Sequence, residues 1–290
     1  MAVYERAYRG YDGEMTASWS RFLIIPRYAL SRVFQSKLFL IFFVLCFVFP
    51  IAAAASIYAM NNLDAVAERL GISLTGFEAV ELSGWHARFF LMIQGVGLSF
   101  VLSLIVGPAL VSADMRNNGL PLYLCRPFSR SEYILGKFAV LALLLSGVTW
   151  IPGMLLIGEQ AYLAGGDWIS SYWSLPLRFF VASWVWILLV SLVSLAVSAT
   201  MRLKTFAAAA MFGVFFVAAA FASIVAEIFE MGLARMLSVH SVTQTLWISL
   251  LGIETTTPLP VIAAWISFAV MCGLSILVLY RKVQAYEVVR

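Results

Sequence analysis

The polar side chains that offer this chain any chemistry gather in one stretch, residues 111–137, which reads VSADMRNNGLPLYLCRPFSRSEYILGK. The stretch is basic and separates two long hydrophobic runs. Its arginines suit contacts with a protein partner or with anionic lipid headgroups. A basic island between two apolar runs must face water, so we interpret it as a loop between two membrane-spanning helices.

Local signals divide this loop into a short helix flanked by turns. Residues 117–119, Asn-Asn-Gly, stop the preceding helix, and Pro121 stands at a tolerated first-turn position of a short apolar run. Pro127 ends that run, because proline disfavours the helical conformation in the residue before it. Ser129 and Glu132 have the spacing of a capping box at the start of the next helix.

The two histidines, His86 and His240, are the other candidates for chemistry. Both fall outside the expected spans, and a histidine beside Trp85 is more typical of a membrane interface than of a metal ligand or a base. The sequence has no HExxH, phosphate-loop or GxSxG motif. The spacing of its three cysteines fits no metal site. A membrane enzyme or assembly factor that uses its outer loops with one of these histidines stays as an alternative.

The composition places the chain in a bilayer. Of its 290 residues 62% are hydrophobic and 12% are charged, which is outside the range of soluble domains. Six apolar runs are long enough to cross about 30 Å of hydrocarbon as helices: residues 38–60, 89–113, 134–157, 175–199, 205–226 and 259–280. We therefore predict an all-α polytopic membrane domain over residues 38–290, preceded by a cytosolic arm and an interfacial helix over residues 1–37.

The distribution of lysine and arginine predicts the orientation of the chain. If both termini are cytoplasmic, the inner segments carry 15 of the 19 lysines and arginines, and the outer segments carry Arg69, Arg88, Arg178 and Arg235. Cytoplasmic loops hold such an excess. The basic pI of about 9.0 therefore reflects topology and not nucleic-acid binding. The middle thirds of the spans hold essentially no ionisable residue, so a proton-driven mechanism has no residues to work with.

The loop and the six-span layout together resemble the permease subunits of type-2 ATP-binding-cassette (ABC) exporters. In that family an acidic residue ends the second span, an apolar stretch and an Arg-Pro or Ser-Pro step follow, and Gly-Lys opens the third span. The matching residues are Asp114, Gly119, Leu120, Leu124, Arg126, Pro127, Ser129, Arg130, Gly136 and Lys137. The family usually has glutamate where this chain has Asp114, so the carboxylate reaches one methylene less.

The resemblance implies a chain that is not an enzyme by itself and that receives work from separate cytosolic ABC ATPase subunits, which hold ATP and Mg. A second copy or a related permease would complete a twelve-helix pathway in the inner (cell) membrane, among membrane lipids. The residues that we assign to coupling with the ATPase are Asp114, Arg116, Leu120, Leu124, Arg126, Pro127 and Arg130. For each arginine, a role limited to positive-inside topology stays open.

Residues 16–37 have the pattern of an amphipathic interfacial helix, with apolar residues at spacings of three and four. Its marker residues are Trp19, Arg21, Phe22 and Arg32. Pro26 should bend or divide it. The resemblance implies a connecting helix that packs beside the coupling loop, and a plain surface anchor stays open.

Polar residues within and beyond the spans give three weaker expectations. Gln94, Ser99 and Ser103 of the second span are candidates for lining a substrate path. Arg178 can pair with Glu159 or Asp167. Residues 227–257 are expected to form two short outer helices with a break near residues 240–241, in the place where the family has re-entrant helices.

Overall fold

Six membrane-spanning segments dominate the computed structural model, which describes residues 18–62, 82–117, 119, 129–257 and 259–283. Within these ranges the chain is helical and has no strand. The segments long and apolar enough to cross a membrane are Lys37–Asn61, Gly84–Arg116, Arg130–Ala164, Leu175–Thr200, Lys204–Ile228 and Val261–Lys282. Over the described residues, the prediction of an all-helical chain with six helices long and apolar enough to span a membrane is confirmed.

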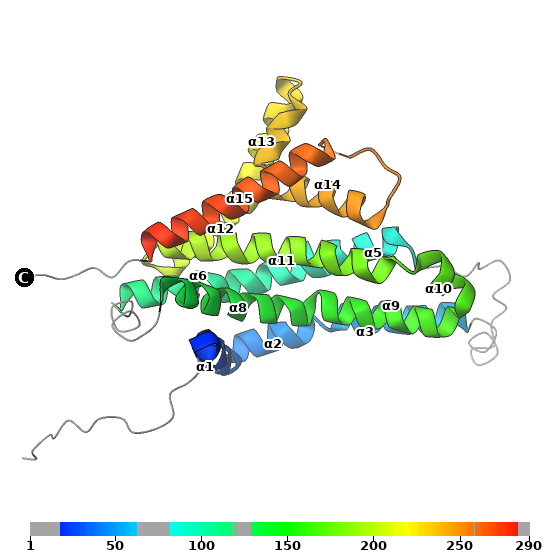
Figure 1. The fold of residues 1–290 in the computed structure, drawn as a ribbon, viewed down its shortest axis with the longest axis horizontal. Coiled ribbons are helices and arrows are strands. Elements are labelled where there is room, and N and C mark those ends of the chain that lie inside the picture. The colour runs from blue at the N-terminus through cyan, green and yellow to red at the C-terminus, as the bar shows by residue number, and fades with distance from the viewer. Residues whose placement is uncertain (1–17, 63–81, 118, 120–128, 258, 284–290) are drawn as a thin grey trace, which may run out of the picture.

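The second, third and fourth spans form the centre of the molecule, and the other three lie around them (Figure 1). In the most apolar window of each central span 50, 67 and 72% of the residues are buried, against 17% in each of the others. The central spans comprise α5 (Gly84–Phe90), the π-helical η2 (Leu91–Ser99), α6 (Phe100–Arg116), α8 (Arg130–Val148), α9 (Trp150–Ala164) and α11 (Leu175–Thr200). A short helix, α10 (Gly166–Tyr172), joins the third span to the fourth.

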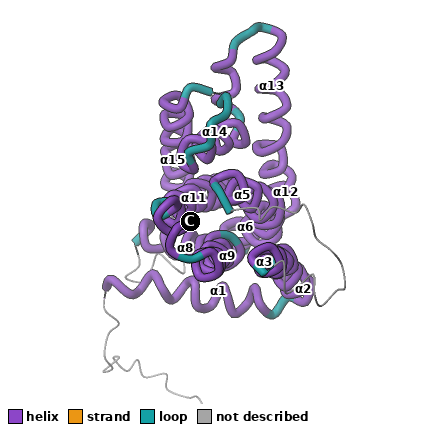
Figure 2. The backbone as a smooth tube through the Cα atoms, turned by 90° about the vertical axis from the view of Figure 1, so that its right-hand side faces the viewer, coloured by secondary structure: helices purple, strands orange, loops and turns teal. Residues whose placement is uncertain are grey.

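The fifth and sixth spans diverge from this centre. The fifth comprises α12 (Lys204–Phe212), the π-helical η3 (Gly213–Val217) and α13 (Ala218–Ile228), and α13 stands away from the other helices in both views (Figures 1 and 2). The sixth is α15 (Val261–Lys282). Since α12 begins at Lys204, four residues after α11 ends at Thr200, the fourth and fifth spans form the helical hairpin expected from their short connection.

The first span is broken into α2 (Lys37–Leu45) and α3 (Val48–Asn61). Pro50 lies in the first turn of α3 and has no N–H to donate to the carbonyl of Cys46, four residues earlier. That carbonyl instead accepts a hydrogen bond from Nε2 of Gln94, at 2.6 Å. The break is therefore satisfied by the second span, as a backbone group inside a membrane must be.

Two short helices connect the fifth span to the sixth. They are η4 (Gly232–Leu237) and α14 (Val239–Leu251). They part at Ser238 and not at residues 240–241 as predicted. The Ser238 hydroxyl accepts a hydrogen bond from the Ser241 N–H at 3.1 Å, so Ser238 caps α14 and places His240 in its first turn.

The segment before the first span is helical and lies across one end of the bundle (Figure 2). A 3₁₀ turn, η1 (Ser18–Leu23), leads into α1 (Ile24–Phe34), and Pro26 is accommodated in the first turn of α1. The segment thus changes helix type just before Pro26. The end of α6, the start of α8 and the end of α15 lie at the same end of the bundle as α1 (Figure 1).

Candidate functional site

The described ends of the predicted coupling loop are well-defined helix termini. Ser129 caps α8: its hydroxyl accepts from the Glu132 N–H at 3.2 Å, and Glu132 Oε2 accepts from the Ser129 N–H at 2.6 Å. The predicted capping box is therefore confirmed. At the other end the Gly119 N–H donates to the Asp114 carbonyl at 2.7 Å, which closes α6. Leu120, Leu124, Arg126 and Pro127 lie outside the described residues, and so does the predicted coupling helix.

Asp114, the carboxylate at the end of the second span, is held by two residues of the third. Lys137 Nζ lies 2.7 Å from Asp114 Oδ2, and Tyr133 Oη donates to the same oxygen at 2.8 Å. The ammonium also lies 5.4 Å from the centroid of the Tyr133 ring. The side chains of Lys137 and Asp114 are only 8% and 20% exposed. The cluster ties α6 to α8 beside the loop, with its charges paired and largely shielded from water.

The N-terminal helix packs next to this cluster on α8. A Cβ added to Gly136 would lie 2.9 Å from Ile25 Cβ and 3.0 Å from the Phe22 carbonyl oxygen. Ile25 and Tyr133 are both buried and belong to one small apolar cluster. Only glycine at position 136 admits such a close approach. The structure thus brings the N-terminal segment, which the resemblance implied to be a connecting helix beside the coupling loop, against α8 where that loop ends.

The remaining predicted residues at this end lie at the surface. Arg116 ends α6 and Arg130 begins α8, and both are exposed. On the N-terminal segment Phe22 is half-buried and Arg32 is exposed. The side chains of Trp19 and Arg21 lie outside the described part of the chain. Arg116 and Arg130 thus mark the two helix termini beside the loop, and Arg32 lines the same groove as Asp114 and Lys137.

A second contact braces α6 about two turns further into the bundle, around Gly107 and Pro108. The Ser198 hydroxyl of α11 donates to the Pro108 carbonyl at 2.8 Å and accepts from the N–H groups of Val111 and Ser112, at 3.2 and 3.0 Å. A Cβ at Gly107 would overlap Ser194. α6 continues through Pro108, and α11 supplies hydrogen bonds to the helical turn that follows the proline.

The three candidate pathway residues are buried within the chain. Gln94 donates to Cys46, Ser103 donates to the Phe100 carbonyl at 2.7 Å, and Ser99 donates to the Gly95 carbonyl at 2.6 Å. Ser99 also accepts from Trp186 Nε1 at 2.8 Å. None of the three lines the cavity at the opposite end of the bundle or the groove between α1 and α6. Gln94 and Ser99 thus join the second span to the first and to the fourth, whereas Ser103 bonds its own helix. The pathway role stays a prediction.

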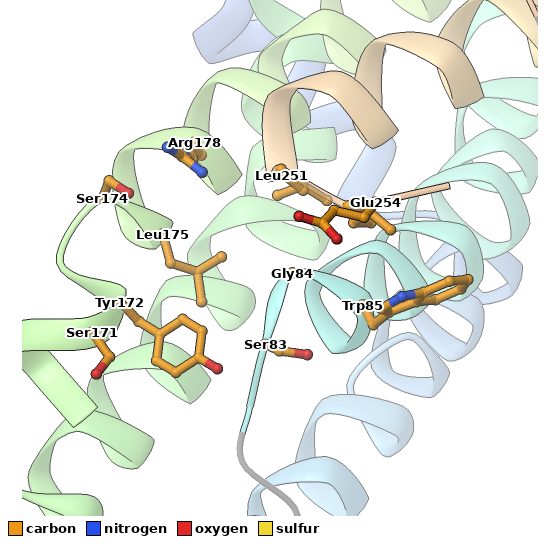
Figure 3. Close-up of a pocket in the computed structure, with 12 residues that line it drawn as sticks. Ser83, Gly84, Trp85, Ser171, Tyr172, Ser174, Leu175, Arg178, Leu251 and Glu254 are labelled. Atoms are coloured by element: carbon orange, nitrogen blue, oxygen red, sulfur yellow. The ribbon is translucent and has the colours of Figure 1, made fainter. Parts of the chain in front are cut away.

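The opposite end of the bundle contains a polar cavity of about 380 Å³ (Figure 3). Its lining includes Ser83 and Trp85 of the second span, Tyr172 of α10, Arg178 of α11 and Glu254. Arg178 does not form the expected ion pair with Glu159 or Asp167. A Cβ at Gly252 would lie 2.8 Å from its Nη1 atom, so the guanidinium sits at the C-terminal end of α14, where a helix dipole favours positive charge.

The two histidines lie near this end in separate contacts. His86 Nδ1 accepts from the Ser83 N–H at 3.2 Å and caps α5. Partial burial, followed by the charge of Arg88, lowers the pKa of His240 below its usual 6.5. Arg88 itself donates twice to Gln244 Oε1, at 3.1 and 2.7 Å. Among the described residues no three His, Cys, Asp or Glu side chains gather in a way that would hold a metal ion.

Tyr133 and Ser198 were missed as site residues, and Lys137 was noted only as part of a motif. A signal existed for two of them, because positions 133 and 137 are four apart and share a helix face. Nothing in the sequence marks Ser198 among the other serines of the fourth span. No protein-family model matches this chain, and no curated protein matches its sequence. The ABC-permease resemblance therefore depends on the residues quoted above.

Proposed function

We propose that this chain is the membrane-spanning permease subunit of an ABC exporter of the inner membrane, with both termini in the cytoplasm. The observation that carries the proposal is the Asp114–Tyr133–Lys137 cluster. It joins the second and third spans at 2.7 and 2.8 Å directly beside the loop assigned to ATPase contact. A force applied to that loop would then move two central spans together and not one alone.

The N-terminal segment supports the same proposal. Because Gly136 lets η1 and α1 lie against α8, a displacement of α8 is passed to the helix that lies across the bundle end. In this mechanism two ATPase subunits close on ATP and Mg, push the residue 120–124 segment, and tilt α6 and α8. Association of two six-span chains, as a homodimer or with a related permease, would form the twelve-helix pathway.

The arrangement of the spans is compatible with a partner permease. The first, fifth and sixth spans bury only 17% of their most apolar windows within the chain. Bulky residues such as Phe206, Phe221 and Ile228 are more than half exposed on α12 and α13. Lipid or another subunit must cover such surfaces. These surfaces do not specify the cargo, which the proposal leaves as a lipid, an amphipathic drug, a hydrophobic peptide or a polysaccharide.

The native Cys125 provides a direct test, since it lies inside the loop and Cys46 and Cys272 lie in spans. The chain is tagged in its native membranes and treated with a thiol-specific cross-linker. We expect Cys125 to form an adduct with a protein that binds ATP, and Cys125→Ser to abolish it. Arg126→Glu and Pro127→Ala should reduce the adduct and ATP-dependent transport while membrane insertion is unchanged.

The same cysteine tests the orientation. A membrane-impermeant maleimide should label Cys125 in inverted vesicles and not in right-side-out vesicles. Labelling from the outer side would contradict the proposal at its root. An inward-facing loop whose variants Arg126→Glu and Pro127→Ala both transport at the wild-type rate would contradict the coupling assignment alone.

A further inference from the structure

A groove of about 480 Å³ runs between the N-terminal helix and the second span, on the membrane side of the Asp114 cluster. One wall comes from α1 and the start of α2, and the other comes from α6. Its volume is within the range of small-molecule sites. The lining is mainly apolar, and its charged residues are Arg32, Asp114 and Lys137.

The groove exists because small side chains line it where two helices would otherwise pack closely. Ala29 of α1 and Ala109 and Ala113 of α6 all contribute to its wall. Larger apolar residues, Ile105 and Val106, continue the α6 wall towards the membrane interior. From Asp114 to Ile105 an α-helix rises about 13 Å, which is roughly the half-thickness of the hydrocarbon core.

The charged residues of the lining favour an anion. The lining has two cations, Arg32 and Lys137, against one carboxylate, and Lys137 already neutralises that carboxylate at 2.7 Å. The Arg32 side chain is exposed and is accessible to an anionic ligand. From residue 18 to residue 61 the sequence has Arg21, Arg27, Arg32 and Lys37 and no aspartate or glutamate, so the local potential is positive.

We infer that this groove binds one anionic phospholipid from the leaflet on the α1 side. The phosphate lies against Arg32, and the upper part of an acyl chain follows Ala113, Ala109 and Ile105 along α6. Three observations favour a lipid: an apolar trough about one leaflet deep, an excess of cations over carboxylates in its lining, and a position where an interfacial helix meets two spans. Basic pockets between membrane helices commonly bind anionic headgroups. The inference is independent of the proposed transport function.

Photolabelling of the purified full-length chain tests the site. The probe is phosphatidylglycerol with a diazirine in its acyl chain, presented in nanodiscs of otherwise zwitterionic phosphatidylcholine. We expect labelling of the α6 peptide that contains residues 105–113. Arg32→Gln should reduce this labelling about fivefold, the effect of losing roughly one favourable headgroup contact. Arg32→Lys should retain most of it.

Two further variants separate a built site from general attraction. Arg27→Gln removes an equally exposed charge from the same helix at a position that does not line the groove, and it should leave the labelling unchanged. Ala109→Trp should fill the trough and abolish labelling while the variant still inserts and elutes as wild type. If Ala109→Trp does not fold, Ala113→Leu gives a smaller obstruction of the same wall.

Three outcomes would overturn the inference. Equal losses in Arg27→Gln and Arg32→Gln would show only diffuse attraction to a basic surface. Equal labelling by a diazirine phosphatidylcholine would remove the selectivity for an anion. Cross-linking of residues 1–17 into the groove of the wild-type chain, with no labelling of residues 105–113, would show that the N-terminal arm occupies it.

Discussion

The two ends of the helical bundle are held together by different kinds of contact. At the α1 end an ion pair, Asp114–Lys137, is shielded from water and reinforced by Tyr133. At the opposite end the contacts between described residues are uncharged or rely on one charge, as in the Arg88–Gln244 pair and the placement of Arg178 at the end of α14. A shielded ion pair is costly to break and specific in geometry. The α1 end is therefore built as a fixed joint, and the opposite end can adjust with smaller penalties.

Loss of one partner of the ion pair gives the largest expected effect. Lys137→Met leaves Asp114 without its cation, and we expect unfolding to become easier by up to about 3 kcal/mol, the lower end for a broken buried pair, because Asp114 keeps 20% exposure. The measurement is SDS titration in mixed micelles, followed by the reactivity of the fully buried Cys46.

Two further variants test whether the lost ion pair causes that loss of stability. Arg130→Met removes an exposed cation from the start of the same helix and should change stability by less than about 0.5 kcal/mol. The double variant Asp114→Asn with Lys137→Met removes both charges and should recover most of the loss. A Lys137→Met chain as stable as wild type would show that the pair does not fix this joint.

The close packing of α6 against α11 at Gly107 gives the effect on stability that we expect to be intermediate in size. Gly107→Ala places a Cβ against Ser194, 3.1 Å from its Cβ and overlapping its Oγ, so we expect a loss of about 1–3 kcal/mol from overpacking. The Ser194 hydroxyl is buried and has no hydrogen-bond partner among the described residues. Adding Ser194→Ala should thus restore part of the loss.

Gly158→Ala in α9 is the matched control, because nothing lies within 4 Å of the added Cβ. That variant should be neutral or stabilising by up to about 1 kcal/mol, the difference in helix propensity. If both glycine variants lose stability equally, close approach of α6 and α11 is not the cause.

The sequence predicted the contacts between helices less well than the helices themselves. Long apolar runs gave the six spans, and the spacing of Ser129 and Glu132 gave the start of α8, because these signals are local. The breaks were missed: nothing in the first span shows that Gln94, far away in the chain, would satisfy the Cys46 carbonyl freed by Pro50. The Asp114 partners were not assigned because membrane spans carry little amphipathic pattern to show which faces meet. The break between η4 and α14 lies at Ser238 and not near residues 240–241, because several residues in this stretch can cap a helix and the sequence does not show which one does.

The pH dependence of the opposite end gives the smallest expected effect. The pKa of His240 is lowered in the folded chain, so at a pH just below 6.5 the unfolded chain binds more protons than the folded one. The free energy of unfolding must then fall as the pH drops from about 6.5 towards the pKa of His240 in the folded chain. Above pH 6.5 this loss of stability is absent. His240→Gln should flatten this part of the pH profile, measured by the same SDS titration between pH 5 and 8. A slope unaffected by His240→Gln would assign the proton uptake to another group and remove the pH sensitivity that distinguishes this end from the ion-paired one.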